Sequence, residues 1–438
     1  MRLGIYCGLA NNMYVFAHAL AAQGMDVCFI RDRSDRYPMS QPVWEDVAFT
    51  LPYEEVPRAN SWPWPRWTEL ERELKWEAPT WLYDPLRDSN DPAEGIPEGI
   101  PIESLGVIDS YFMKRYLRTP TRSAALEAMR SCDGLLVSGI EGSLLAKLSG
   151  RPYIIWPFGG DIMVAAGLLQ PKFYHLRTWL IHVLTRKQLV GAYASAICIG
   201  AHEPAALQQD FFGAEHFFRK QKVAHIPIPL GTRPRKSKGD RREFLEQLIQ
   251  RLGFQLPPTD YIGFVPSRVD YQWKGQDRLL SSLQRVFSEG NATNIHIIFS
   301  GWGVDLQKAR QFVKDNQLEG KTTFLNCALS KPLLYQFYQY ADFVVDQFIV
   351  GMCGTSALEA MACGAPLITW LNEEVERPWG NPPVLRARTE ADISRILRGL
   401  NEGCVDLETV GTSLQEWLGR NYAPSIVPRR LLELFSER

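Results

Sequence analysis

Apolar runs of strand length alternate with helix-like patterns along the whole chain, which predicts β-α-β units and parallel sheets. In the first half, a helical pattern over Tyr14–Gln23 ends at Gly24. The alternation restarts at Tyr261, so we expect two α/β units in one chain. The expected strands are Leu3–Cys7, Val27–Ile30, Gly134–Val137, Tyr153–Trp156, Ala196–Ile199, Tyr261–Val265, Ile295–Phe299, Thr323–Leu325, Phe343–Asp346 and Pro366–Thr369, and helices are expected near 276–287, 304–316, 332–340 and 355–362.

The boundary between the two units is expected near residue 230, where IPIPLGTRPRKSKGD mixes prolines, glycines and charges without a period. The domains predicted from this are 1–229 and 230–413. Residues 52–103 interleave tryptophans with prolines, which predicts a long insertion with little regular structure. Its indoles have two open roles, stacking on sugar rings or packing over the core. We expect the helical tail, 414–438, to pack back on the first domain.

Composition narrows the class of protein. Hydrophobic residues make up 45% of the 438 residues and charged residues 22%, which is typical of a globular chain. The 48 Lys and Arg residues nearly balance the 49 Asp and Glu residues, so no overall basic field attracts nucleic acid. The eight cysteines form no C-x-x-C pair, which argues against a zinc ribbon or a redox motif and fits a reducing cytoplasm.

The sequence was also compared with the patterns of secretory signals and membrane-spanning helices. The apolar stretch in MRLGIYCGLANN is too short for a secretory signal and indicates a first strand and turn. No run of about 18 uncharged apolar residues occurs, so we expect a cytoplasmic protein without a spanning helix. Segment 172–187 combines basic and apolar residues, with Lys172, Arg177, Arg186 and Lys187 as the cations. This pattern suits either weak contact with the inner face of an anionic membrane or an ordinary half-buried helix.

A glycine-containing loop follows the expected strand Phe343–Asp346. It reads QFIVGMCGTSALEAMACGAPLIT, in which Gly351, Cys353 and Gly354 precede a helix that Thr355 is placed to cap. Such a loop presents unpaired N–H groups and a positive helix end, which suits a phosphate. Glu359, one turn into the helix, is placed to accept hydrogen bonds from a ribose diol. The alternative is a buried helix with an ordinary cap.

Two cations follow the expected strand Tyr261–Val265, in the loop PSRVDYQWKGQDRLL. Arg268 and Lys274 would neutralise a diphosphate, because a guanidinium holds phosphate oxygens through two hydrogen bonds and an ammonium adds a point charge. The alternative is solvated surface charge.

The first half offers fewer chemical signals. The G-x-G-x-x-G, G-x-x-x-x-G-K-[ST], H-E-x-x-H and G-x-S-x-G motifs are all absent, which weakens dehydrogenase, P-loop, zinc protease and hydrolase interpretations. The turn GLANN follows the first strand, and we assign its Gly8 and Asn11 to donor binding. Asp161 follows two glycines after Tyr153–Trp156 and is either a carboxylate of the site or a helix cap. The seven histidines show no metal spacing, and none is assigned to catalysis.

Two motifs in the second half carry a family resemblance. R-x5-K-G-x-D begins at Arg268, and G-x-x-G-x4-E-A-M-A-x-G-x-P begins at Gly351. Together with the two α/β units, they resemble the retaining GT-B glycosyltransferases of family 4, also called glycosyl transferases group 1. The likeness covers 195–438 well and 1–165 loosely. It implies two Rossmann-like domains facing across a cleft.

The resemblance also implies roles for individual residues. Glu359 would hold the donor ribose, Arg268 and Lys274 the diphosphate, and the segment near Asn326 would lie by the base. Asp161, with Arg268 and Lys274, forms the expected catalytic set. The chain departs from the family at Gly351, where a glutamate usually meets the donor sugar, and at Phe158, where a histidine is frequent.

These expectations amount to a metal-independent retaining glycosyltransferase. It would move a sugar from a UDP- or GDP-linked donor to a glycan or lipid-linked saccharide, without a permanently bound cofactor. Two alternatives remain: a sugar-nucleotide epimerase or phosphorylase on a similar scaffold, and a non-catalytic nucleotide-sugar-binding protein, which the departures at Gly351 and Phe158 motivate.

Overall fold

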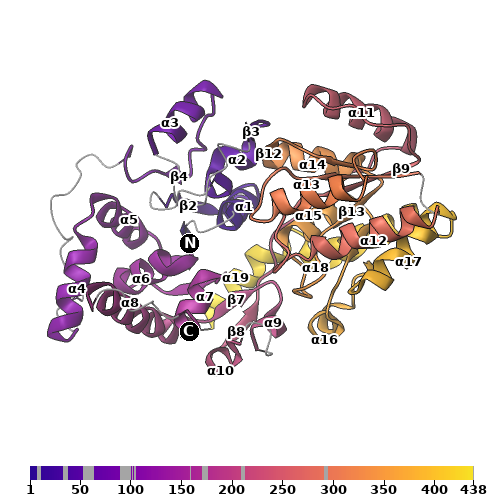
Figure 1. Cartoon of the computed structure of the whole chain (residues 1–438). Helices are drawn as coiled ribbons and strands as arrows, with labels where there is room; N and C mark the ends of the chain where they lie inside the picture. The colour runs from indigo at the N-terminus through magenta and orange to yellow at the C-terminus, as the bar shows by residue number, and fades with distance from the viewer. Residues whose placement is uncertain are drawn as a thin grey trace. The chain divides into compact units, whose positions relative to one another are not determined.

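The computed structural model describes residues 1–6, 11–32, 38–52, 64–88, 100, 102, 105–157, 159–169, 176–208, 213–290 and 294–437. The chain forms two compact units (Figure 1). The first unit contains Met1–Val43, Asn60–Pro229 and Pro424–Arg438, and the second contains Trp44–Ala59 and Leu230–Ala423. The chain therefore passes between the units at Pro229 and Leu230, near the expected boundary, and also at three other places.

The first unit is built on a seven-stranded parallel sheet of order β4-β2-β1-β5-β6-β7-β8. Leu3 of the central strand β1 lies opposite Val27 on one side and Gly134 on the other. The strands are β1 (Arg2–Tyr6), β2 (Asp26–Ile30), β4 (Leu82–Tyr83), β5 (Gly134–Val137), β6 (Tyr153–Ile155), β7 (Ile199–Ala201) and β8 (Val223–His225). The helices are α1 (Asn12–Ala21), α3 (Trp64–Glu73), α4 (Val107–Leu117), α5 (Pro120–Arg130), α6 (Gly139–Ser149), α7 (Gly160–Ala165), α8 (Leu176–Ser195), α9 (Pro204–Gln208), α10 (Glu215–Phe218) and α19 (Ile426–Ser436).

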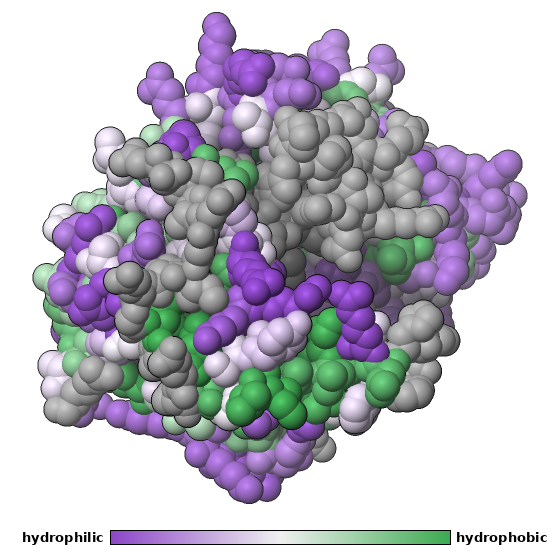
Figure 2. All heavy atoms as spheres, turned by 90° about the vertical axis from the view of Figure 1, so that its left-hand side faces the viewer, coloured by the Kyte–Doolittle hydropathy of each residue, from purple (hydrophilic) through white to green (hydrophobic). Residues whose placement is uncertain are grey.

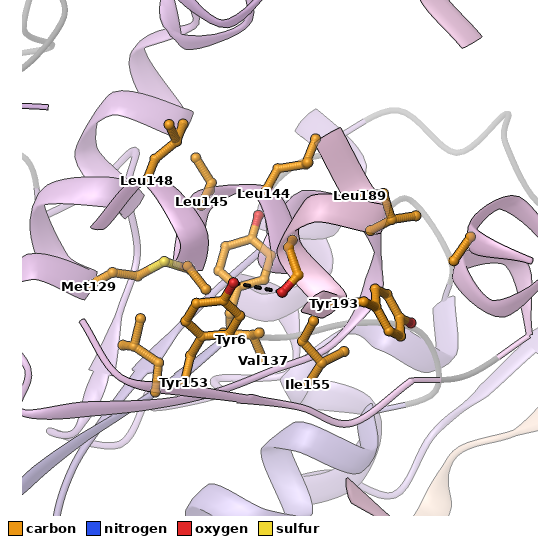
Figure 3. Close-up of a cluster of buried hydrophobic side chains, with 14 of the residues drawn as sticks. Tyr6, Met129, Val137, Leu144, Leu145, Leu148, Tyr153, Ile155, Leu189 and Tyr193 are labelled. Atoms are coloured by element: carbon orange, nitrogen blue, oxygen red, sulfur yellow. Dashed lines mark hydrogen bonds between the residues drawn. The ribbon is translucent and has the colours of Figure 1, made fainter. Parts of the chain in front are cut away.

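The core of the first unit lies between strands and helices that are far apart in the sequence. Figure 3 shows Tyr6, Val137 and Ile155 from the strands beside Leu144 of α6 and Leu189 of α8. All five side chains are at most 2% exposed. Complete burial of an aliphatic side chain contributes about 1.5–3 kcal/mol, so this cluster anchors α6 and α8 to the sheet.

The second unit has a six-stranded parallel sheet of order β11-β10-β9-β13-β14-β15. Its strands are β9 (Tyr261–Val265), β10 (Ile295–Phe299), β11 (Thr322–Phe324), β13 (Phe343–Val345), β14 (Leu367–Thr369) and β15 (Leu385–Arg386). Its helices are α11 (Lys238–Arg251), α12 (Gln276–Ser288), α13 (Leu306–Asp315), α14 (Lys331–Tyr340), α15 (Thr355–Ala362), α16 (Glu373–Glu376), α17 (Glu390–Asn401) and α18 (Leu407–Tyr422).

A short segment from the first half of the sequence completes the second unit. Strand β3 (Thr50–Pro52), preceded by α2 (Pro42–Asp46), pairs antiparallel with β12 (Cys327–Leu329), with Leu51 opposite Ala328. The Phe49 N–H also donates to Ser330 Oγ at 2.9 Å. No periodicity in the sequence indicates this pairing, because each strand is three residues long.

Three features differ from the sequence-based expectations. The strand expected at Ala196–Ile199 is displaced to β7, because α8 continues to Ser195. Within 52–103, the described part contains α3 and β4, and Trp67 is completely buried, so that part is more regular than expected.

The expected tail 414–438 divides between the two units. Helix α18 packs against α15 in the second unit, where Gln415 Nε2 donates to the Ala362 carbonyl at 2.9 Å. Only Pro424–Arg438 joins the first unit, where Phe435 lies so close to Gly134 that an added Cβ would approach its ring to 2.8 Å. In the second unit, Gly411 allows α18 a similarly close approach to the carbonyl of Gly364.

Membrane-spanning potential was searched in the described part of the chain. None of its helices is both long enough and apolar enough to cross a bilayer.

Candidate functional site

The topology of the second sheet selects one point for a ligand. Strand β9 lies between β10 and β13. From β9 the sheet continues through β10 and β11 on one side and through β13, β14 and β15 on the other, so the strand order reverses between β9 and β13. In open parallel sheets, ligands bind beyond the carboxyl ends of the strands where the order reverses. The loops that leave β9 and β13 carry the predicted phosphate-binding residues, so the structure brings these residues together at this point.

The two predicted cations are each held by a carboxylate. Arg268 Nε lies 3.0 Å from Asp270 Oδ2, and the Arg268 side chain is 40% exposed. Lys274 Nζ lies 3.2 Å from Asp346 Oδ1, and the Asp346 side chain is completely buried while that of Lys274 is 21% exposed. An ammonium has three donors, so Lys274 retains capacity for a further anion.

Hydrogen bonds join the two loops into one structure. The Phe348 N–H donates to the Lys274 carbonyl at 3.0 Å, which ties the loop after β13 to the loop after β9. Buried Gln276 holds the second loop by accepting from the Asp270 N–H at 3.1 Å and donating to the Arg268 carbonyl at 2.8 Å. The positions of Arg268 and Lys274 are therefore set by backbone contacts.

Gln347 organises the glycine loop. Its buried Oε1 accepts from three consecutive N–H groups, those of Ile349 at 3.0 Å, Val350 at 2.6 Å and Gly351 at 3.3 Å. Gly351 has a φ of 76°, and an added Cβ would lie 2.7 Å from the Trp370 ring. A glutamate at position 351 is thus excluded by both backbone conformation and space.

The start of α15 lies beside the cations, but its cap differs from the expected one. Gly354 is the N-cap, and Thr355 is the first helical residue and makes no side-chain cap, so the capping role assigned to Thr355 is wrong. A Cβ on Gly354 would lie 3.5 Å from Asp346 Oδ2 and 3.8 Å from Lys274 Nζ. The positive end of α15 therefore lies next to the Lys274–Asp346 pair. Cys353 is completely buried behind this turn.

Glu359 is a buried member of an ion pair. Its Oε1 lies 2.6 Å from Lys331 Nζ, and its Oε2 accepts from the Tyr338 hydroxyl at 3.4 Å. Burial opposes the charge on Lys331, but the carboxylates of Glu359 and Glu45 raise its pKa above the ordinary value. The Glu359 carboxylate is therefore oriented by its neighbours, and its assignment to the ribose remains a prediction.

The remaining predicted residue of the second unit is Asn326. It is exposed in the turn between β11 and β12, and its Oδ1 accepts from Arg310 Nη2 at 3.0 Å. This turn is at the carboxyl edge of the same parallel sheet.

The predicted residues of the first half lie in the first unit. Asn11 is the buried N-cap of α1 with a φ of 55°, and its Nδ2 donates to the Gln41 carbonyl at 2.7 Å. Asp161, in the first turn of α7, is 3% exposed and accepts from the Tyr193 hydroxyl at 3.4 Å. Burial and the Asp161 carboxylate raise the pKa of Tyr193. Gly8 and Phe158 lie outside the described residues.

Sequence reasoning missed several residues of this site. The carboxylate, amide and ammonium partners Asp346, Gln347 and Lys331 were not assigned to the site. The loop Ser300–Gly303 after β10 was also missed. In it a Cβ on Gly301 would overlap the Leu325 carbonyl, and the Val269 N–H donates to the Trp302 carbonyl at 2.9 Å. Its G-x-G pattern directly after a strand was the available signal.

Comparison with known proteins identifies the second unit. Residues 259–378 match the family described as glycosyl transferases group 1. The matched segment lies within the second unit. The resemblance inferred from the two motifs and the enzyme class, glycosyltransferase, are thus confirmed. No curated protein matches the chain.

Solved structures confirm the GT-B fold of the chain. HepE of Anabaena in complex with UDP-glucose is 12% identical with a TM-score of 0.59, and the match covers 100% of both chains. Sucrose-phosphate synthase of Thermosynechococcus elongatus is 15% identical with a TM-score of 0.60, covering 100% of this chain and 98% of the other. A glycosyltransferase of Rickettsia africae is 11% identical with a TM-score of 0.54, with the same coverage.

Proposed function

We propose that this protein is a retaining glycosyltransferase that transfers a sugar from a nucleoside diphosphate sugar to a glycan or lipid-linked saccharide. The observation that carries the proposal is the convergence of Arg268, Lys274 and the start of α15 at the strand-order reversal of the second sheet. UDP is the favoured donor nucleotide, because HepE was solved with UDP and with UDP-glucose. GDP is the other candidate.

The site supplies stabilisation where negative charge develops. Transfer breaks the bond between the sugar carbon and the diphosphate oxygen and forms a bond to the acceptor oxygen. Lys274, Arg268 and the N–H groups at the start of α15 stabilise the departing diphosphate without reorganising during the reaction. A diphosphate oxygen takes the proton of the acceptor hydroxyl, which is consistent with the lack of an assigned histidine base.

The donor nucleoside is assigned to the other predicted residues. Each oxygen of the Glu359 carboxylate has two lone pairs, so its bonds to Lys331 and Tyr338 leave capacity for ribose hydroxyls. Asn326 is assigned to the base. In the first unit, Asp161 is assigned to the transferred sugar or the acceptor, and Gly8 and Asn11 to the donor.

A second candidate is a non-catalytic protein that binds nucleotide sugars. One observation favours it. Position 351, where similar enzymes usually carry the glutamate that meets the donor sugar, is a glycine whose φ of 76° and contact with Trp370 exclude that side chain.

Nucleotide release separates the two candidates. The purified protein is incubated with UDP- and GDP-linked sugars, with and without glycan acceptors, and the freed nucleoside diphosphate is measured. Turnover above background that is lost in Lys274→Ala and kept in Lys308→Ala, an exposed lysine paired with Asp305, supports the enzyme. Binding of UDP with no turnover for any donor and acceptor supports the non-catalytic alternative. Neither binding nor turnover contradicts the assigned site.

A further inference from the structure

The first unit exposes apolar side chains on two of its helices. On α4, Val107 is 88% exposed, and Ile108 and Tyr111 are 66% and 67% exposed. Helix α8 exposes five more within its first eight residues: Leu176, Trp179, Leu180, Ile181 and Val183. Single exposed apolar residues are ordinary, whereas a group of this size indicates a surface that is covered by a partner.

The two helices form one surface. Helix α4 packs against α8, and Lys187 Nζ of α8 lies 2.5 Å from Asp109 Oδ2 of α4. Figure 2 views this side of the molecule and shows a band of apolar side chains next to hydrophilic ones. We call the exposed residues of these two helices the α4–α8 face.

Helix α8 is divided into an exposed N-terminal half and a C-terminal half that contributes to the core. Its buried residues, Gln188, Leu189, Ala192 and Tyr193, all lie in the C-terminal half and pack into the core. Residues 176–181 are all exposed. Folding of the first unit therefore accounts for the apolar residues of one half of α8 only.

The charge of this face is strongly one-sided. Helix α8 contains no acidic residue and exposes Arg177, Arg186 and Lys187. Helix α4 exposes Lys114 and Arg115, and Asp109, the one acidic residue of α4, is paired with Lys187. Four cations on the two helices thus remain without an acidic residue from either helix to balance them.

A hollow beside α8 adds a further apolar and basic element. It has a volume of about 490 Å³, and Leu169, Trp179, Val183 and Arg186 are among its lining residues. A lining that combines apolar side chains with a guanidinium matches the chemistry of a phospholipid, whose acyl chain is apolar and whose head group is anionic.

We propose that the α4–α8 face docks the protein on an anionic lipid bilayer. Apolar side chains enter the interfacial region while the cations meet lipid phosphates, as in other amphipathic surface helices. A second copy of the chain is the competing occupant, but two such faces would bring their uncompensated cations together. The proposal does not rest on the donor site, because binding to a bilayer requires neither donor nor acceptor.

Co-sedimentation with vesicles tests the proposal. We expect binding at low salt to vesicles that contain phosphatidylglycerol, release by high salt, and weak binding to pure phosphatidylcholine. Each basic residue at an anionic surface contributes about fivefold in affinity, so Lys114→Ala/Arg115→Ala/Arg177→Ala should lower it roughly a hundredfold. The matched control, Lys308→Ala/Arg395→Ala/Arg429→Ala, removes three exposed cations from elsewhere and should bind normally.

A second measurement tests the apolar part. In vesicles with brominated acyl chains, tryptophan fluorescence should be quenched, and Trp179→Phe should remove part of that quenching. Three results would overturn the proposal: no binding to anionic vesicles at low salt, equal loss of affinity in the control triple variant, or dimers in lipid-free solution that Leu180→Ser dissociates. Because these assays use no nucleotide sugar, their failure leaves the proposed transferase activity to its own test.

Discussion

The two sheets hold charge at their carboxyl edges in opposite ways. In the first unit, Glu141 of α6, the helix that follows β5, accepts from Tyr6 at 3.0 Å, from Tyr116 at 3.2 Å and from Arg122 Nε at 2.7 Å. Burial and nearby carboxylates raise the pKa of Tyr6 well above its ordinary value, so its hydroxyl stays a donor. In the second unit, Lys274 has a single buried carboxylate beside it and retains 21% exposure.

This difference distinguishes a charged group that stabilises packing from one that retains capacity to bind a ligand. A carboxylate surrounded by donors from three elements has little capacity for a ligand, and its network stabilises the packing of those elements. A partly exposed ammonium with unused donors retains that capacity. Similar parallel sheets therefore present a rigid polar cluster in one unit and the proposed phosphate-binding arrangement in the other.

Removing one cation from each edge gives the largest expected effect. Lys274→Ala leaves Asp346 as an uncompensated buried charge, and we expect a loss of about 3–5 kcal/mol in stability. We also expect at least about a tenfold loss in kcat/KM, because a charge-assisted contact to the diphosphate is lost. Arg122→Ala should destabilise the first unit without changing the affinity of the folded protein for UDP. Thermal unfolding and UDP titration of both variants make the comparison.

Arg268 provides the exposed counterpart of Lys274. Because its side chain is 40% exposed, Arg268→Ala should change stability by less than about 1 kcal/mol while lowering kcat/KM at least about tenfold. Unchanged kinetics in both Arg268→Ala and Lys274→Ala would contradict the assigned phosphate site.

Substitutions at Gly351 test whether the shape of the glycine loop is a constraint at the carboxyl edge of the second sheet. Gly351→Glu should cost about 2–5 kcal/mol, the sum of left-handed backbone strain and overpacking against Trp370. Gly380→Ala is the control, because Gly380 has a φ of 77° but no atom within 4 Å of an added Cβ. Only the backbone part, about 1–2 kcal/mol, should appear there. Equal losses in Gly351→Ala and Gly380→Ala, measured by chemical denaturation, would rule out the Trp370 contact as a constraint.

Acid sensitivity should be shared by the two units, since each has a histidine in its sheet, half-buried His225 and buried His296, whose ring is partly removed from water. Burial lowers the pKa of His225 in β8 and of His296 in β10 to about 4, against an ordinary value of 6.5. Between pH 6.5 and pH 4 these histidines bind protons in the unfolded chain but not in the folded chain. Their contribution to the free energy of unfolding is therefore complete above pH 6.5 and is lost progressively as the pH falls to 4. The effect is on the order of 3 kcal/mol for each histidine.

Melting temperatures measured across this pH range check the prediction. His225→Asn and His296→Asn should each flatten the dependence of the melting temperature on pH. A dependence that neither substitution alters would show that other groups cause the acid sensitivity.

Substitution of Glu359 tests whether a buried ion pair of the second unit also binds a ligand. Glu359→Gln keeps one acceptor oxygen and should lower UDP affinity by about 1.5–3 kcal/mol. The deoxy analogue of UDP that lacks the 2′-hydroxyl serves as the control ligand, because a ribose contact predicts that wild type prefers UDP and that the variant loses the preference. If both ligands lose affinity equally, or stability alone changes, Glu359 acts as a structural partner of Lys331.

Metal removal should have the smallest effect. The proposed site stabilises the diphosphate with Arg268, Lys274 and a helix end, so transferase activity should be unchanged in excess EDTA. Inhibition that Mg²⁺ or Mn²⁺ restores would mean that a divalent cation contributes at the diphosphate instead.

Much of the second unit could be predicted from the sequence because its signals are local. Strands β9 and β10 have the expected bounds, since each is a short apolar run between polar or glycine-containing turns. Parallel strands place their carboxyl ends at one edge, so the positions of Arg268, Lys274 and Gly354 followed from the strand assignments. The motif spacing identified the family for the same reason.

Contacts between segments that are far apart in the sequence could not be predicted from these local signals. The pairing of β3 with β12, the buried partner Asp346 of Lys274, and the contact between Gly351 and Trp370 each join residues that no common period connects. The α4–α8 face is another case, because Lys114 and Arg177 belong to separate helices that only folding makes neighbours.

The sequence by itself therefore determined the α/β class, the strands around the site and the residue types proposed to meet a diphosphate, because periodicity and turn chemistry act over a few residues. The tertiary structure decided which charged side chains are fully engaged with internal partners and which retain unused hydrogen-bond donors, because burial and the distance to a partner are properties of packing. Arg122 and Lys274 are both single cations in the sequence. Only packing places Arg122 beside a carboxylate that also accepts from two tyrosine hydroxyls, and gives Lys274 a single buried carboxylate partner.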